Sequence, residues 1–245
     1  RAIYPGGIYI EGDRIKAVFA MGEVELPEGI PQIDVGGKWL VPGFIDIHLH
    51  GGGGGDFMDA KVESLEAMAK THAEGGTTTL FPATLTSSWE DLVAALDCFA
   101  RYGEKAGSGA RLWGVHLEGP YFAYEQRGAQ DPRHLKNPDP GEYLEILEKY
   151  PFIARVSAAP ELPGGMRLGR ELRKRGVLAA IGHSDATYDE VLEAIDAGYS
   201  HITHLWSAMS GVKRINCCRV AGAIEAGLLL DDLTVEVIAD GKHLP

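Results

Sequence analysis

Residues 41–55 read Val-Pro-Gly-Phe-Ile-Asp-Ile-His-Leu-His-Gly-Gly-Gly-Gly-Gly and form the most informative segment of the chain. The short apolar run that ends at the two histidines predicts a buried strand. Because side chains alternate along a strand, His48 and His50 should point to the same side, about 7 Å apart. Two imidazoles on one side of a rigid strand end are able to hold a metal ion. The glycines after them predict a turn that leaves the mouth of the site open.

The composition of the whole chain argues against several classes of partner. The chain has 245 residues, enough for one large barrel or two ordinary domains, and 45% of them are apolar. Its formal net charge of -12 argues against nucleic acid and against anionic membranes, because no basic face is available to neutralise phosphates. A single small phosphorylated ligand stays compatible, since it needs only a local cation or a few backbone amides.

Cysteine usage and hydropathy indicate the compartment. Cys98, Cys217 and Cys218 are odd in number and two are adjacent, which argues against a disulfide framework and favours the reducing cytoplasm. No apolar run reaches the roughly 18 residues of a transmembrane helix, and no signal peptide is visible. The chain begins at Arg1 and stops at Pro245 just after a strand-like run, so we expect it to be part of a longer chain.

The first 40 residues differ in pattern from the rest. They predict short strands, two of them around Gly12-Asp13, in a segment too small for a core of its own. From residue 41 onward, short apolar runs alternate with amphipathic helical segments. The apolar runs span 44–48, 77–82, 112–118, 153–160, 177–183, 201–204 and 234–240; the helical segments span 62–74, 89–102, 143–149, 167–175, 188–197 and 221–229.

Strand–helix–strand units repeated in this way predict a parallel sheet with helical crossovers. Seven such strands are present, and a (β/α)₈ barrel has eight. We therefore predict an α/β fold in which residues 41–245 form a TIM-like barrel, truncated before strand eight, beside a partial small domain at 1–40. An open doubly wound sheet is the alternative, but no Gly-x-Gly-x-x-Gly opens a helix after the first strand.

Residues of metal-binding type occur where these strands end. They are His48, His50, Glu118, His183 and His204. In a parallel barrel the carboxyl ends of all strands open on one face, where active sites form. Imidazole and carboxylate ligands together suit Zn²⁺, and also Fe²⁺ or Mn²⁺. The sequence therefore predicts a divalent metal site on that face.

Other residues carry weaker signals. His72, His134 and His201 are expected to be packed rather than ligands, and His116 is expected to support a ligand from behind. The loop 213–219 is basic, and it either holds an anionic group of a substrate or is simply solvated.

Taken together, these segments resemble the amidohydrolase superfamily and, within it, the N-acetylglucosamine-6-phosphate deacetylases. The matching segments span 41–51, 114–122, 128–130, 182–186, 203–210 and 237–244. The His-x-His motif marks only the superfamily, whereas His-Leu-Glu-Gly-Pro and Ile-Ala-Asp-Gly-x-His are specific to the deacetylase group. The resemblance implies a (β/α)₈ barrel beside a small β-sandwich built from both chain ends.

The resemblance also implies roles for individual residues. The family's metal ligands match Glu118, His183 and His204, and members that keep both histidines of the first strand hold a second ion there, here at His48 and His50. The other matched positions are substrate contacts: Gln130, Ser207, Ala208 and His243. His243 is also expected to assist catalysis. Arg214 is expected to bind the phosphate, with Arg219 as the alternative. The family's catalytic Asp ends strand eight, which lies beyond Pro245.

The expected activity is metal-dependent hydrolysis of the acetamide of N-acetylglucosamine 6-phosphate, which yields glucosamine 6-phosphate and acetate. Zinc is the expected metal, with iron or manganese as alternatives, in one or two ions. Family members are commonly homodimers. The alternatives are an N-acetylgalactosamine-6-phosphate deacetylase or another amidohydrolase, a non-catalytic protein that binds metal or sugar phosphate, and a purely structural α/β domain.

Overall fold

The computed structural model describes residues 5–102 and 109–245. The chain divides into two compact units, residues 1–42 and residues 43–245. In the first unit, β1 (Gly6–Glu11) and β2 (Arg14–Ala20) form an antiparallel hairpin. Its turn lies at Gly12, whose φ of 61° suits glycine. The two short strands predicted around Gly12-Asp13 are therefore present.

The second unit alternates parallel strands with helices. Its main strands are β3 (Phe44–Leu49), β6 (Thr77–Pro82), β7 (Arg111–Leu112), β8 (Val115–Glu118), β9 (Ile153–Ala158), β10 (Leu178–Ile181), β11 (Tyr199–Ile202) and β14 (Thr234–Val235). Its helices are α1 (Val62–Glu74), α2 (Trp89–Tyr102), α3 (Pro140–Lys149), α4 (Gly165–Arg175), α5 (Tyr188–Ala197) and α6 (Ala223–Leu229). Short elements complete it: β4 (Gly51–Gly52), β5 (Gly55–Asp56), η1 (Phe57–Asp59), η2 (Tyr124–Gln126), β12 (Lys213–Ile215) and β13 (Cys218–Val220).

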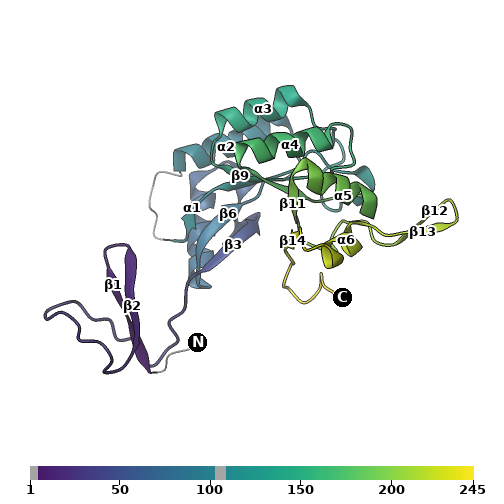
Figure 1. The fold of residues 1–245 in the computed structure, drawn as a ribbon. Helices are drawn as coiled ribbons and strands as arrows, with labels where there is room; N and C mark the ends of the chain where they lie inside the picture. Colours follow the sequence, from purple (N-terminus) through teal and green to yellow (C-terminus); the bar gives the residue numbers. More distant parts are fainter. Residues whose placement is uncertain (1–4, 103–108) are drawn as a thin grey trace. The chain divides into compact units, whose positions relative to one another are not determined.

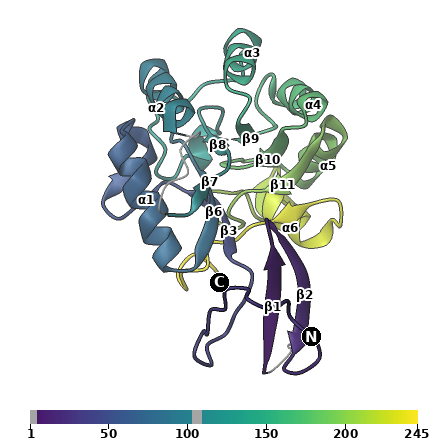
Figure 2. The same ribbon diagram turned by 90° about the vertical axis from the view of Figure 1, so that its left-hand side faces the viewer.

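The strands form two parallel runs, β3-β6-β7 and β8-β9-β10-β11-β14. A parallel bridge between Ala83 and His116 continues the order from β6 to β8. Helices α1 to α5 lie around the outside of the strands (Figures 1 and 2). The unit therefore has an α/β fold with a parallel sheet, as the alternating pattern predicts.

Two predicted strands differ in extent from the observed ones. The run 112–118 is split into β7 and β8, and the run 234–240 is a strand only at Thr234–Val235. In the described residues β14 pairs with β11 alone, and beyond Val235 the backbone of Glu236 adds hydrogen bonds to Ile202 and Leu205.

The core lies between the strands and the surrounding helices. It includes fully buried side chains from both layers, such as Met68, Leu80, Leu96, Leu168 and Ile181. Burying one such side chain stabilises the fold by about 1.5–3 kcal/mol, so this layer holds the strand ends in place. No described helix combines the length and hydropathy that crossing a bilayer requires.

Candidate metal centre

Five side chains converge where parallel strands end. His48 is in β3 and His50 follows it, Glu118 is the last residue of β8, and His183 and His204 each lie two residues beyond their strands, β10 and β11. Parallel strands present their carboxyl ends at one edge, which is why residues up to 156 positions apart in sequence meet here. The candidate ligand atoms form two groups, His48–His50–Glu118 and Glu118–His183–His204, with the atoms of each within 4.8 Å of one another.

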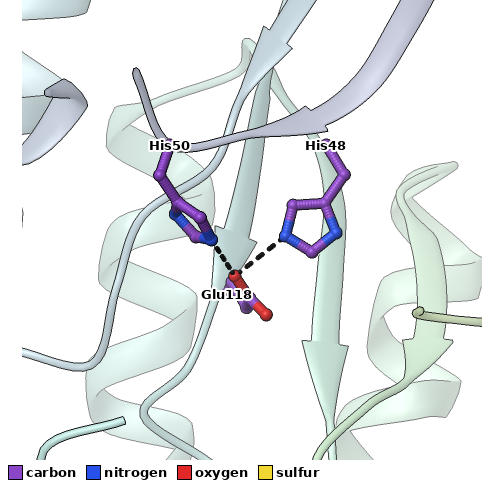
Figure 3. Close-up of side chains that lie close together, drawn as sticks. All are labelled: His48, His50 and Glu118. Carbon is purple, nitrogen blue, oxygen red and sulfur yellow. Dashed lines mark hydrogen bonds and ion pairs between the residues drawn. The ribbon is translucent and has the colours of Figure 1, made fainter. Parts of the chain in front are cut away.

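Glu118 joins the two groups. Its Oε2 lies 3.0 Å from Nε2 of His48 and 3.1 Å from Nε2 of His50. Figure 3 shows both rings pointing from the same strand end at this carboxylate. Its Oε1 lies 3.2 Å from Nε2 of His183 and 3.3 Å from Nε2 of His204. Each carboxylate oxygen thus faces a different pair of imidazoles.

The glycines after His50 help to fix this strand end. Gly51–Gly52 pairs with Gly55–Asp56 as the small antiparallel ladder β4–β5, so the predicted open turn is instead a short paired element. A Cβ on Gly51 would lie 2.2 Å from the carbonyl oxygen of Gly55. Only glycine fits such a close backbone approach, because any side chain would force the two strands apart.

Both histidines of the second group have backbones in the left-handed region. The φ angle is 48° at His183 and 33° at His204. For a residue other than glycine this costs roughly 1–3 kcal/mol, and such strain clusters at functional sites. Two hydrogen bonds compensate for this strain at His183. Its Nδ1 bonds to the carbonyl oxygen of Gln126, and the carbonyl oxygen of His183 accepts the amide of Ala123.

The hydrogen bonds at the outer ring nitrogens show that the cluster fits a cation. His183 Nδ1 lies 2.8 Å from the carbonyl oxygen of Gln126, and His50 Nδ1 lies 3.2 Å from that of Ala83. A carbonyl only accepts, so these Nδ1 atoms carry hydrogen, and in the neutral imidazoles Nε2 presents a lone pair to Glu118. Lone pairs that face carboxylate oxygens repel unless a cation lies between them. The donor set therefore fits a divalent ion of the zinc, iron or manganese type.

The protonation equilibria agree with this crowding. Burial by itself raises the pKa of Glu118, but its close contacts with the rings of His183, His204, His48 and His50 outweigh burial and hold that pKa well below its usual range. Burial lowers the pKa of His48, yet its bonds to Glu118 and Glu236 raise that pKa to about 9. The cluster is thus a place where positive charge is stabilised, as a cation site must be.

Glu236 belongs to this site and escaped the sequence analysis. Its Oε1 lies 2.7 Å from Nδ1 of His48 and accepts a hydrogen bond of 3.0 Å from the amide of His204. It also forms an ion pair with the buried Arg155. A charged residue inside the apolar run 234–240 was the available signal, since a carboxylate there must find a partner.

Comparison with known proteins agrees with this geometry. The model of the amidohydrolase family matches residues 39–245. The chain belongs to the amidohydrolase family. It is 34% identical to the N-acetylglucosamine-6-phosphate deacetylase of Lysinibacillus sphaericus, over 89% of this chain and 55% of that protein. It is also 34% identical to the N-acetylgalactosamine-6-phosphate deacetylase of Escherichia coli O157:H7, over 89% of this chain and 57% of that one.

Solved structures give the same family relationship. The N-acetyl-D-glucosamine-6-phosphate deacetylase of Mycobacterium smegmatis superposes with a TM-score of 0.87 at 36% identity, covering 99% of this chain and 61% of that one. A mutant of that enzyme was solved in complex with N-acetyl-D-glucosamine-6-phosphate. The deacetylase of Pasteurella multocida matches with a TM-score of 0.87 at 32% identity. The chain spans between 55% and 62% of the length of these relatives.

The substrate positions implied by the family resemblance lie at different distances from the cluster. Ala208 is near it: a Cβ on Gly128 would lie 3.6 Å from Cβ of Ala208 and 3.7 Å from Cε1 of His183. Ser207 follows directly on the His204 turn and donates its amide to that residue's carbonyl. Gln130 is buried, and its Oε1 accepts a hydrogen bond from the amide of Thr86.

The remaining predicted residues lie outside the cluster. Arg214 and Arg219 are exposed cross-strand partners in the β12–β13 hairpin, which projects from the rest of this unit in Figure 1. His243 is exposed, and its Nδ1 lies 2.8 Å from Oδ2 of Asp240. His243 is therefore in neither group of convergent side chains, and it lies in a segment without strands that follows the backbone hydrogen bonds of Glu236.

The histidines expected to be packed are mostly supported by local hydrogen bonds. His116 is fully buried, with Nε2 2.7 Å from Oγ of Ser157, and its ring lies edge-on to that of His48 at 4.5 Å. It thus packs against the ring of a candidate ligand, and its supporting role stays a prediction. His72 and His201 bond to Gly51 and Thr234 respectively.

Proposed function

We propose that this chain is the metal-binding part of an enzyme that hydrolyses the acetamide of N-acetylglucosamine 6-phosphate to glucosamine 6-phosphate and acetate. The convergence of four imidazoles on the buried Glu118 carries the proposal, since it offers the donor set of a divalent metal site at the carboxyl ends of parallel strands. The names of its relatives supply the substrate. The E. coli relative favours a second candidate, the galactosamine isomer of the same substrate.

We further propose that the parallel sheet is part of a (β/α)₈ barrel whose eighth strand lies outside residues 1–245. Residues 1–40 would be part of a small β-sandwich domain, for which the β1–β2 hairpin is the support. The parallel strand order and the helices on its outside support the barrel.

The free cysteines Cys98, Cys217 and Cys218 suit a reducing compartment, so we propose that the protein is cytoplasmic. A homodimer is the assembly that we expect.

Zinc is the proposed metal. One ion would be held by Glu118, His183 and His204, and a second ion, if present, by His48 and His50. The ion would supply Lewis-acid chemistry, which activates water and polarises the acetamide carbonyl. The chain's own residues bind and orient the substrate around that point. Proposed substrate contacts are Gln130, Ser207, Ala208, Arg214 and His243. Phosphate binding by Arg214 would lie away from the reacting bond, so its binding energy would serve positioning.

The protein expressed from its complete gene tests the proposal. Acetate release from N-acetylglucosamine 6-phosphate should be lost after exhaustive chelation and should return when zinc is restored. The ratio of kcat/KM for the glucosamine and galactosamine substrates separates the two candidates. Full activity in the metal-free protein would contradict the hydrolytic mechanism. Zinc binding without turnover of either sugar would instead favour the non-catalytic binding protein.

A further inference from the structure

A carboxylate lies behind the His48 imidazole. Glu236 Oε1 is 2.7 Å from His48 Nδ1, while His48 Nε2 is 3.0 Å from Oε2 of Glu118. The ring thus lies between two carboxylates, one on the side of the convergent ligand atoms and one behind. Histidines that bind metals commonly donate their second N–H to such an outer carboxylate, which fixes both the tautomer and the ring orientation.

Arg155 holds that carboxylate in place. Its Nη1 lies 2.6 Å from Oε2 of Glu236 and its Nη2 lies 2.9 Å from Oε1, a two-point ion pair. Nη2 also donates to Oγ1 of Thr203 at 2.6 Å. The Arg155 side chain is only 4% exposed, so the guanidinium has no access to solvent that would let it swing away. A bidentate pair of this kind fixes geometry as well as charge.

The same carboxylate contacts the second group of ligands. Glu236 Oε1 accepts a hydrogen bond of 3.0 Å from the backbone amide of His204. That residue has a φ of 33°, a strained conformation that needs support from its surroundings. The backbone of Glu236 contributes too, since its carbonyl oxygen accepts the amide of Leu205 at 2.8 Å. One residue after β14 thus contacts a member of each group.

We propose that Glu236, clamped by Arg155, is a positioning residue for the metal ligands. It accepts Nδ1–H of His48, which leaves the Nε2 lone pair directed at the ion position, and it supports the turn that carries His204. The inference rests on the metal site of the proposed function and goes beyond it, because Glu236 is not itself a member of either ligand group. Its removal should weaken metal binding in a protein that is still folded.

The test measures zinc affinity by competition with a chromophoric chelator, and the ligand field by the visible spectrum of the Co²⁺ form. The variant Glu236→Gln keeps the size of the side chain and an acceptor oxygen for the His204 amide, but it removes the charge that faces His48. The zinc Kd should rise by about 10–100-fold, as outer-sphere partners of ligating histidines typically show, and the Co²⁺ spectrum should change.

Two further variants keep the test decisive if Glu236→Gln folds poorly because Arg155 has lost its counter-charge. The double variant Glu236→Gln with Arg155→Met removes both charges together. The variant Glu236→Asp keeps the ion pair but shortens the carboxylate by one methylene group, which moves it from His48. Both should show weakened zinc binding with a folded circular dichroism spectrum.

The matched control is Glu171→Gln. It removes a carboxylate that bonds to Arg175 on the surface of α4, with the same change of charge. Its zinc Kd and Co²⁺ spectrum should equal those of the wild type. Wild-type affinity and spectrum in folded Glu236 variants would overturn the inference and leave the proposed function standing. A wild-type protein that binds no zinc would overturn both.

Discussion

The Nε2 atoms of His183 and His204 lie 3.2 Å apart, at the ends of the neighbouring parallel strands β10 and β11. Both face Oε1 of Glu118, and all three side chains are buried. Within the described residues, Nδ1 of His204 has no hydrogen-bond partner at all. Buried imidazoles so close to each other are unfavourable unless a shared cation or proton compensates for their lost hydration.

Replacing His204 by asparagine should remove one metal ligand and lower zinc affinity by more than about 100-fold, because loss of an outer partner alone already costs 10–100-fold. The proposed deacetylase activity of the protein from the complete gene should fall in parallel. Metal content after dialysis and the chelator-competition Kd are the measurements. His134→Asn, which changes a histidine outside the cluster, is the control. An unchanged Kd in His204→Asn would remove this residue from the ligand set.

Metal binding should release protons. The pKa of His48 is raised to about 9, so near pH 7.5 its imidazole is charged in the metal-free protein, whereas a ligand must be neutral. Binding should therefore release about one proton from this residue, and affinity should fall as the pH drops below about 9. Titration calorimetry in buffers of different ionisation enthalpy measures the release. His48→Asn should reduce it, and an equal release in both proteins would contradict the assignment.

The same group should make the metal-free fold depend on pH. The folded pKa of His48 lies above its unfolded value of about 6.5, so protonation stabilises the folded state. That contribution is fully present below about pH 6.5 and is lost as the pH rises through about 9. It amounts to roughly 3 kcal/mol at about 1.4 kcal/mol per pKa unit. Urea unfolding of the chelated protein should show this loss, and His48→Asn should flatten it.

The glycine ladder after His50 should matter for the metal site. A Cβ on Gly51 would lie 2.2 Å from the Gly55 carbonyl oxygen, so Gly51→Ala should separate β4 from β5 and weaken zinc binding at His50. Gly54→Ala is the matched variant, because a Cβ there meets nothing within 4 Å and only its φ of 87° is strained. Gly54→Ala should lower stability by about 1 kcal/mol and leave zinc affinity unchanged. Equal zinc affinities for the two variants would show that the ladder does not position His50.

The N-terminus of α5 should depend on Thr187. Its Oγ1 accepts the amide of Glu190 at 3.3 Å, and Glu190 Oε2 accepts the amide of Thr187 at 2.7 Å, which is a capping box. Thr187→Ala should lower the free energy of unfolding by about 1 kcal/mol, whereas Thr187→Ser keeps the hydroxyl and should change it little. Thermal or urea unfolding measures both. Identical losses in the two variants would mean that packing of the threonine methyl, and not the cap, is responsible.

Much of the site could be predicted because it depends on local order along the chain. His48, His50, Glu118, His183 and His204 each follow a short apolar run, and parallel strands place all such positions at one edge. Alternation along β3 also predicts that His48 and His50 share a side, and both contact the same oxygen of Glu118. The roles of these residues as metal ligands stay a prediction that zinc binding will test.

The supporting residues could not be predicted in this way. Glu236 lies 188 residues from His48 and 81 residues from Arg155 in the sequence. Their contacts depend on which side chains face each other in the folded sheet. The position of His243 was equally open, since the family resemblance placed it near the substrate while the structure pairs it with Asp240. The segment that carries it, residues 236–245, contains no strand.

The alternation of strands and helices follows from the hydrophobic period of the chain, and the chemistry of the donor set follows from the residue types at the strand ends. The contacts of Glu118 with two pairs of imidazoles, and those of Glu236 and Arg155 behind His48, became visible only in the folded molecule. Such pairings depend on strand register and on the packing of buried charges against one another, and neither is written in any short segment of the chain.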